Sequence, residues 1–258
     1  SYKGYGTSSL QKDCEELSEL VRHLRDQRSA KSIALVGHST GCQDSVYFMK
    51  HADADLRKMV RVVALQAPVS DREAGNMVET EEEISARSLM LERGRKMKDT
   101  GAGGEILCIE DGVPITADRW VSLNDEGGSD DMFSSDLSDA KLKELLGHMN
   151  PKGQLELDRK QTGISPPPPP LPLRPVVSTK RPLKTIVASS LADEYVPSHI
   201  DRVLLAERIC KAMRGDDSLD VLNLTLNPPA NHNLDNDASA AILFCKTVGE
   251  TLSRAIHD

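Results

Sequence analysis

The stretch spanning residues 32–41, SIALVGHSTG, decides the fold predicted for this chain. Its first five residues form a short apolar run rich in strand formers. Its last five residues read G-x-S-x-G around Ser39, and a helical pattern over residues 42–49 follows at once. A serine placed between a strand and a helix in this motif sits in a strained turn that exposes its hydroxyl. Ser39 is therefore the candidate nucleophile.

The residues around Ser39 have predicted roles of their own. We expect Gly37 and Gly41 to be glycines because neighbouring backbones approach too closely for a Cβ. The helix that follows directs its N-terminal amides toward the serine, so the backbone N–H of Thr40 is the predicted oxyanion donor. A glycine-rich turn without catalytic function is the competing interpretation, and the strand before and helix after the motif favour catalysis.

Strands and helices alternate along the rest of the chain. Ser8 and Gln11 are predicted to form a capping box at the start of a first helix. Further strands are predicted at residues 60–65, 184–189 and 221–226, and further helices at about 198–213 and 237–256. Apolar runs without polar alternation are typical of parallel strands that are buried on both faces. The pattern predicts an α/β fold with a mostly parallel sheet and helices on both faces.

Composition divides the chain into four segments. Residues 1–70 and 184–258 are predicted to form the core, which carries the nucleophile in the first part and the acid and histidine in the second. Residues 71–165 are richer in charge, with one strand run at 106–109, and are predicted to be a helical cap insertion. Residues 166–183 are predicted to be a proline-rich loop, because polyproline lacks N–H donors for a sheet.

The predicted catalytic acid and base follow two later strands. Asp193 comes shortly after the strand at 184–189, and His232 follows the strand at 221–226. This is the chain order of serine, acid and histidine that the elbow motif predicts. His232 would accept the proton of Ser39, and Asp193 would orient its imidazole.

Rival residues exist for both roles. Glu194 is an alternative acid, whereas Asp193 has its own alternative role as a turn residue or helix cap. His38, His148 and His199 are alternative bases, and His232 is favoured because it alone follows the last strand.

Composition excludes several classes of function. A net charge of −8 predicts no nucleic-acid partner, because binding a polyanion needs a clustered basic surface. Five scattered cysteines without a C-x-x-C pair suggest neither disulfides nor zinc, which predicts a cytoplasmic protein. No apolar run approaches the roughly 20 residues of a membrane span. The aspartate-rich residues 124–139 do not fit a calcium loop, so no metal and no cofactor are predicted.

The proline-rich segment contains a possible peptide ligand. Pro169, Pro172 and Arg174 match the P-x-x-P-x-R form that SH3-type grooves accept. A plain spacer is the alternative interpretation, and it is favoured.

Several longer motifs resemble one known family. They are residues 5–10 (YGTSSL), 37–44 (GHSTGCQD), 66–73 (QAPVSDRE), 130–137 (DDMFSSDL), 146–149 (LGHM) and 193–197 (DEYVP). They are similar to an α/β-hydrolase family of plants, algae and fungi described as a domain of unknown function, which includes fungal siderophore esterases that open fusarinine-type ester bonds. The resemblance implies that Ser39, Asp193 and His232 are the triad positions.

Two departures from the family pattern affect expectations. The resemblance implies early strands and a glycine-rich loop ahead of this segment, which would supply a second oxyanion donor, and they are missing here. Residues 160–181 read as an insertion. Because losing one oxyanion donor lowers turnover ~10²- to 10³-fold, we expect this chain alone to be weakly active or poorly folded.

These observations together predict a serine hydrolase. Its expected substrate is a carboxylic ester of a small or medium-sized molecule, cleaved through an acyl-enzyme without a cofactor. The alternative is a catalytically silent protein of the same fold that binds a ligand or partner. Triad chemistry alone does not separate an esterase from a thioesterase, lipase or peptidase, and the sequence does not indicate an oligomeric state.

Overall fold

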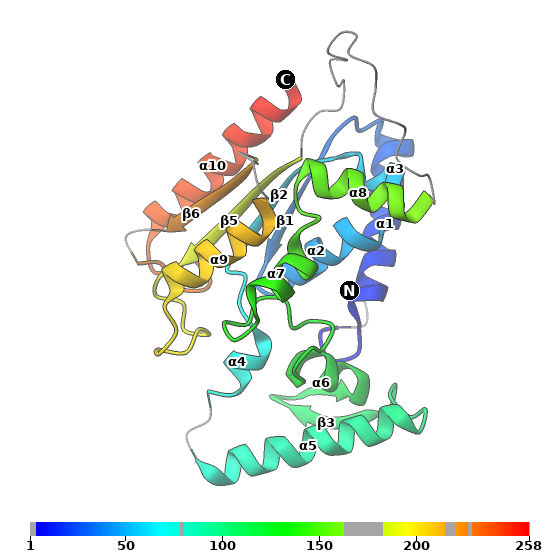
Figure 1. The fold of residues 1–258 in the computed structure, drawn as a ribbon, viewed down its shortest axis with the longest axis vertical. Helices are drawn as coiled ribbons and strands as arrows, with labels where there is room; N and C mark the ends of the chain where they lie inside the picture. Colours follow the sequence, from blue (N-terminus) through cyan, green and yellow to red (C-terminus); the bar gives the residue numbers. More distant parts are fainter. Residues whose placement is uncertain (1–3, 78–79, 163–182, 215–219, 227–228, 258) are drawn as a thin grey trace.

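The computed structural model describes residues 4–77, 80–162, 183–214, 220–226 and 229–257 (Figure 1). Its strands are β1 (Ile33–His38), β2 (Val60–Gln66), β3 (Ile106–Glu110), β4 (Val113–Thr116), β5 (Lys184–Ser190) and β6 (Val221–Leu226). Its helices are α1 (Leu10–Arg28), α2 (Gly41–His51), α3 (Ala54–Arg57), α4 (Asp71–Gly75), α5 (Glu81–Asp99), α6 (Ala117–Asn124), α7 (Asp139–Leu146), α8 (Pro151–Thr162), α9 (Arg202–Arg214) and α10 (Ala238–His257).

The central sheet is parallel and has the strand order β1-β2-β5-β6 among the described residues. Its middle strands are the continuous apolar runs, and residues 62–65 of β2 are fully buried. The carboxyl ends of the strands share one edge, where His38 at the end of β1 pairs with Gln66 at the end of β2. The predicted residues Ser39, Asp193 and His232 all follow strands at this edge.

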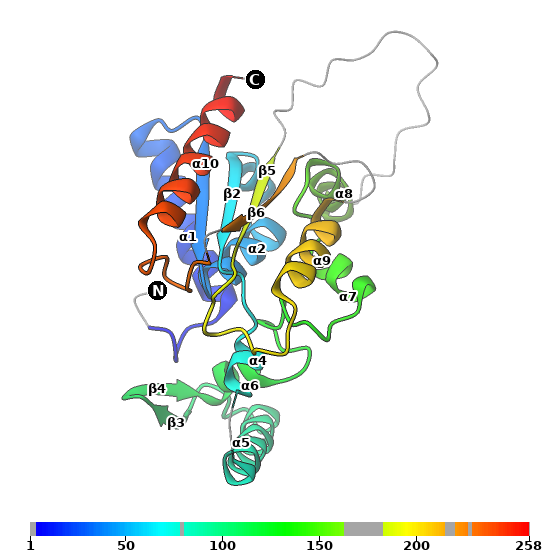
Figure 2. The same cartoon turned by 90° about the vertical axis from the view of Figure 1, so that its left-hand side faces the viewer.

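Helices cover both faces of the sheet (Figures 1 and 2). Side chains alternate between the two faces of β2: Val63 and Leu65 join the core beneath α1, α2 and α9, and Val62 and Ala64 pack toward α10. This alternation follows from the two-residue period of a strand. The predicted mostly parallel sheet with helices on both faces is confirmed.

The segment between β2 and β5 contributes to two regions. Helices α5 and α6 and the antiparallel hairpin β3–β4 lie beyond α4, away from the sheet (Figure 2). Helices α7 and α8 instead pack beside α9 and α2, and Leu142 and Leu146 of α7 are fully buried in the main core. The division of the chain at residues 71 and 165 stays a prediction. Pro169, Pro172 and Arg174 lie outside the described residues.

One local prediction is wrong, and one strand was not predicted. Helix α1 begins after Ser9, not Ser8, because the extended Ser9 accepts the backbone N–H of Lys12 while the Ser8 hydroxyl donates to Asp13 over 2.8 Å. Strand β4 was not predicted, because its four residues include Pro114 and form a strand only by pairing with β3. In the part of the chain that is described, no helix is long and apolar enough to cross a membrane.

Candidate active site

Ser39 occupies the sharp turn between β1 and α2. Its φ of 53° lies in the left-handed region, which is unfavourable for a residue with a side chain. A Cβ on Gly37 would lie 2.3 Å from the carbonyl oxygen of Gly41, so a glycine is required at position 37. The reason predicted for Gly41 is wrong, because a Cβ there would meet no atom within 4 Å. The turn is closed by the amide of Ser39, which donates to the carbonyl of Gln66 over 3.1 Å.

Asp193 and His232 form a buried pair. The imidazole Nδ1 of His232 lies 2.9 Å and 3.0 Å from the two carboxylate oxygens of Asp193. The exposed fractions of His232 and Asp193 are 4% and 1%. A carboxylate that accepts from Nδ1–H fixes the proton of the neutral ring on that nitrogen, which leaves Nε2 with a lone pair for proton transfer.

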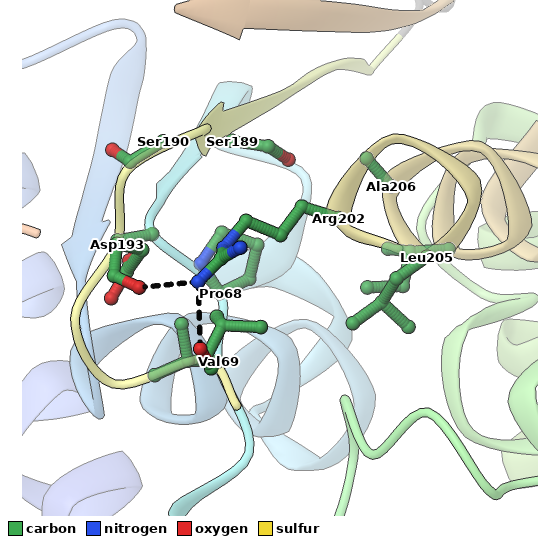
Figure 3. Close-up of a pocket in the computed structure, with 11 residues that line it drawn as sticks. Pro68, Val69, Ser189, Ser190, Asp193, Arg202, Leu205 and Ala206 are labelled. Atoms are coloured by element: carbon green, nitrogen blue, oxygen red, sulfur yellow. Dashed lines mark hydrogen bonds between the residues drawn. The ribbon is translucent and has the colours of Figure 1, made fainter. Parts of the chain in front are cut away.

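Backbone contacts hold the loop that carries Asp193. The amide of Tyr195 donates to Asp193 Oδ1 over 3.0 Å. Arg202 of α9 points its guanidinium beneath this loop and donates from Nη2 to the carbonyls of Asp193 and Val196, over 3.1 Å and 2.8 Å (Figure 3). The alternative acid Glu194 accepts the backbone N–H of His232 over 2.9 Å, so the ring nitrogen is left to Asp193.

Gln66 links the histidine loop to the nucleophile turn. Its Nε2 donates to the carbonyl oxygen of His232 over 3.0 Å. Because the carbonyl oxygen of His232 can only accept, the amide nitrogen of Gln66 must face it, and the amide oxygen Oε1 then accepts from Nδ1 of His38. The rings of His38 and His232 lie with their centroids 4.9 Å apart. Sequence reasoning did not identify Gln66.

Ser39 and His232 face one cavity of about 330 Å³. Its walls are formed by Tyr5, His38, Ser39, Thr40, Val69, Asp71, Ala74, Tyr195 and His232. The rival base His148 lies elsewhere, buried under the helices with Nε2 3.0 Å from the carbonyl of Val46. His199 lines a separate cavity. The structure thus brings His232, and not His148 or His199, to the cavity of Ser39.

Thr40 and Cys42 follow Ser39 and differ in accessibility. Thr40 lines the cavity, and its backbone N–H donates to no other group in the described part of the chain. Cys42 is fully buried, and its thiol contacts the carbonyl oxygens of Gly37 and Gln66. Burial raises the pKa of the Cys42 thiol well above its usual value, which disfavours a nucleophilic thiolate.

Asp71 is a further acidic group in the cavity wall, and sequence reasoning gave it no role. Its Oδ2 accepts from Nε2 of the fully buried Gln43 over 2.6 Å. Burial, and then the nearby Asp130, raise the pKa of Asp71 to about 7. Arg119 opposes this rise, but its own Nη1 lies 2.9 Å from both carboxylate oxygens of Asp130. Among the described residues, no group of three or more His, Cys, Asp or Glu is arranged to hold a metal ion.

Comparisons with known proteins identify a family and relatives that are named as esterases. A family described as "Protein of unknown function (DUF1749)" matches residues 1–253. Fusarinine C esterase sidJ of Aspergillus fumigatus is 25% identical over 285 residues, which cover 93% of this chain and 73% of that protein. Esterase AN6793 of Emericella nidulans is 28% identical over 209 residues, which cover 60% of this chain and 55% of that protein. The solved structure of the siderophore hydrolase EstB from Aspergillus fumigatus has the same fold as this chain, with a TM-score of 0.68 and 24% sequence identity. The match covers all of this chain and 79% of the EstB chain.

Proposed function

This chain belongs to the family described as "Protein of unknown function (DUF1749)", and we propose that this carboxylic ester hydrolase uses Ser39 as its nucleophile. The resemblance recognised in the sequence is confirmed, and the fold is that of the α/β-hydrolases. The relatives named as esterases place the activity in ester hydrolysis. The expected substrate is a small-molecule ester.

One observation carries the serine mechanism. A strained serine and a buried histidine–aspartate pair, from three separate strand ends, converge on a single cavity. The φ of Ser39 costs of order 1 kcal/mol, and such strain persists where the surrounding structure enforces it. A merely structural turn has no need to point a hydroxyl into a cavity that also holds the free nitrogen of an imidazole.

The first half of the reaction forms an acyl-enzyme. Ser39 Oγ bonds to the ester carbonyl carbon while its proton passes to Nε2 of His232, and the carbonyl oxygen becomes an oxyanion. Asp193 stabilises the imidazolium that results. The backbone N–H of Thr40 donates to the oxyanion. As the tetrahedral intermediate collapses, the leaving alkoxide takes the proton from His232.

The second half of the reaction restores the enzyme. Water gives a proton to His232 Nε2 and bonds to the acyl carbon. The second intermediate breaks its bond to Ser39, which recovers the proton, and the carboxylic acid is released. No cofactor takes part in either half.

Covalent labelling tests this assignment even if turnover is slow. A fluorophosphonate probe should modify Ser39, as located by peptide mass spectrometry, and Ser39→Ala should abolish the label. His232→Ala should slow labelling by about 10³-fold, because a serine without a base is a weak nucleophile. His199→Ala is the matched control and should label at the wild-type rate.

Two results would overturn the proposal. Labelling that persists in Ser39→Ala would place the nucleophile elsewhere. A folded wild-type chain that takes up no label would favour the catalytically silent binding protein instead.

A further inference from the structure

The side chains that line the catalytic cavity include a carboxylate but no lysine or arginine among the described residues. The cavity wall contains the carboxylate of Asp71 and the phenol rings of Tyr5 and Tyr195. Tyr5 and Tyr195 are about half exposed, at 45% and 50%. The guanidinium of Arg119 lies over the Tyr5 ring, 5.1 Å from its centroid, and the Tyr195 ring contacts His232 with the two centroids 4.6 Å apart, so each ring has only part of its surface open to a ligand. Carboxylates and the faces of aromatic rings both attract cations.

The carboxylate of Asp71 is held in place. Asp71 is the first residue of α4, and this helix is fixed by Ser70, whose hydroxyl accepts the N–H of Glu73 over 3.0 Å. Gln43, fully buried in the first turn of α2, donates to Oδ2 of Asp71. A group fixed from two elements presents its charge at a constant position relative to Ser39, which lies two residues before the start of α2.

Arg119 and His232 lower the pKa of Asp71, but burial of the carboxyl outweighs both. Asp71 forms no ion pair with any described residue, and Arg119 is engaged by Asp130 and by the carbonyl of Tyr5 at 2.9 Å. The raised pKa of Asp71, which is about 7, reflects the resulting cost of its charge in this half-buried place. A bound cation would remove that cost, since opposite charges in a partly desolvated site attract strongly.

We propose that Asp71 is a specificity-determining residue that selects esters carrying a cationic group, such as a protonated amine, on the part of the substrate bound beside Ser39. This inference rests on the proposed function, because it assigns a substrate class to the same site. The exposed part of the Tyr195 ring contacts the same cation. Esters with a free carboxylate in that position are disfavoured by repulsion from Asp71.

A matched pair of substrates tests the charge alone. p-Nitrophenyl 6-aminohexanoate and p-nitrophenyl heptanoate differ by an ammonium group in place of a terminal methyl. At pH 8 the wild-type chain should prefer the amino ester by at least about 10-fold in kcat/KM, the equivalent of one ion pair in a partly buried site. Asp71→Asn should reduce this preference to about 2-fold or less, and Asp71→Glu, which keeps the charge, should retain most of it.

The control variants separate the possible failures. Asp111→Asn removes an exposed carboxylate from the β3–β4 turn and should leave the preference unchanged. If Asp71→Asn slows both esters equally, or leaves the preference intact, Asp71 has a structural role and the inference is wrong. If Ser39→Ala still hydrolyses both esters, the proposed function itself fails. An inactive Ser39→Ala together with an unaltered preference in Asp71→Asn overturns only the inference about Asp71.

Discussion

The side-chain amide of Gln66 donates to the backbone carbonyl of His232 over 3.0 Å, although 166 residues separate them. Gln66 ends β2, and His232 lies in the loop after β6, two strands away in the sheet order. The same amide accepts from His38, which directly precedes Ser39. The position of the proposed base is therefore tied to the nucleophile turn through one side chain.

Replacing Gln66 should lower turnover through this link. Gln66→Leu removes both hydrogen bonds, so we expect kcat to fall about 10-fold as the His232 loop loosens, because small misplacements of a base are costly. Gln154→Leu is the matched control, since the Gln154 side chain also links two segments of the chain, by donating to the carbonyls of Met49 and His148 away from the cavity. Both variants should lose stability in urea denaturation, and only Gln66→Leu should lose kcat with p-nitrophenyl acetate. Equal kcat values in the two variants would refute a positioning role.

The two neighbouring acids should differ sharply in their effect on catalysis. Asp193→Asn should lower kcat by about 10³- to 10⁴-fold, because an amide next to Nδ1 favours the wrong tautomer of His232. Glu194→Gln should cost less than about 10-fold, since a glutamine oxygen still accepts the His232 backbone N–H. Single-turnover acylation rates for both variants measure the difference. A larger loss in Glu194→Gln would assign the acid to position 194.

The strands, and the loops after them that carry the proposed triad residues, were predictable because their signals are local. Strand β6 matches the predicted residues 221–226, and β2 and β5 extend only one residue beyond the predicted ends. Buried parallel strands are continuous apolar runs, and their ends are marked by the polar loops that carry Asp193 and His232.

Gln66 and Asp71 were not predictable as site residues. A polar residue after an apolar strand has no periodic signal, and its importance depends on which distant loop it contacts. Gln66 lies one residue beyond the end of the predicted strand, and both Gln66 and Asp71 were visible only as part of one family motif, residues 66–73. The cavity wall also takes Tyr5 from a segment that is joined to the end of β4, where the backbone N–H of Thr116 donates to the carbonyl of Gly6. That docking is a tertiary contact with no counterpart in spacing or composition.

The strained backbone of Ser39 predicts an inversion of the usual effect of glycine on stability. At a φ of 53°, Ser39→Gly should be more stable than Ser39→Ala by about 1 kcal/mol, because glycine tolerates the left-handed region. At Ser45, inside helix α2, Ser45→Gly should be less stable than Ser45→Ala by roughly 0.5–1 kcal/mol. Urea denaturation of the four variants measures both differences. The same order at both positions would mean that Ser39 is not strained.

The raised pKa of Asp44, in α2, predicts that the free energy of unfolding changes with pH. Burial, and then Asp13, raise the pKa of its carboxyl to about 7, whereas an aspartate in the unfolded chain titrates near pH 4. Between these pH values the folded state binds more protons, so this residue lowers the free energy of unfolding as the pH rises toward 8. The Asp44→Asn variant has no ionisable group at this position, so its free energy of unfolding should not fall in this way.

The stability advantage of the variant over the wild type should therefore be larger at pH 8 than at pH 5, by roughly 2 kcal/mol. The difference between the two proteins is the quantity to measure, by thermal or urea denaturation at both pH values. His148 acts in the opposite direction, because burial lowers its pKa to about 4 and stability falls as the pH drops below about 6.5. That contribution is common to both proteins and cancels in the comparison. Asp111→Asn, whose side chain already faces water, should stay close to the wild type throughout. A gain for Asp44→Asn at pH 5 equal to that at pH 8 would show that packing, and not the buried charge, is responsible.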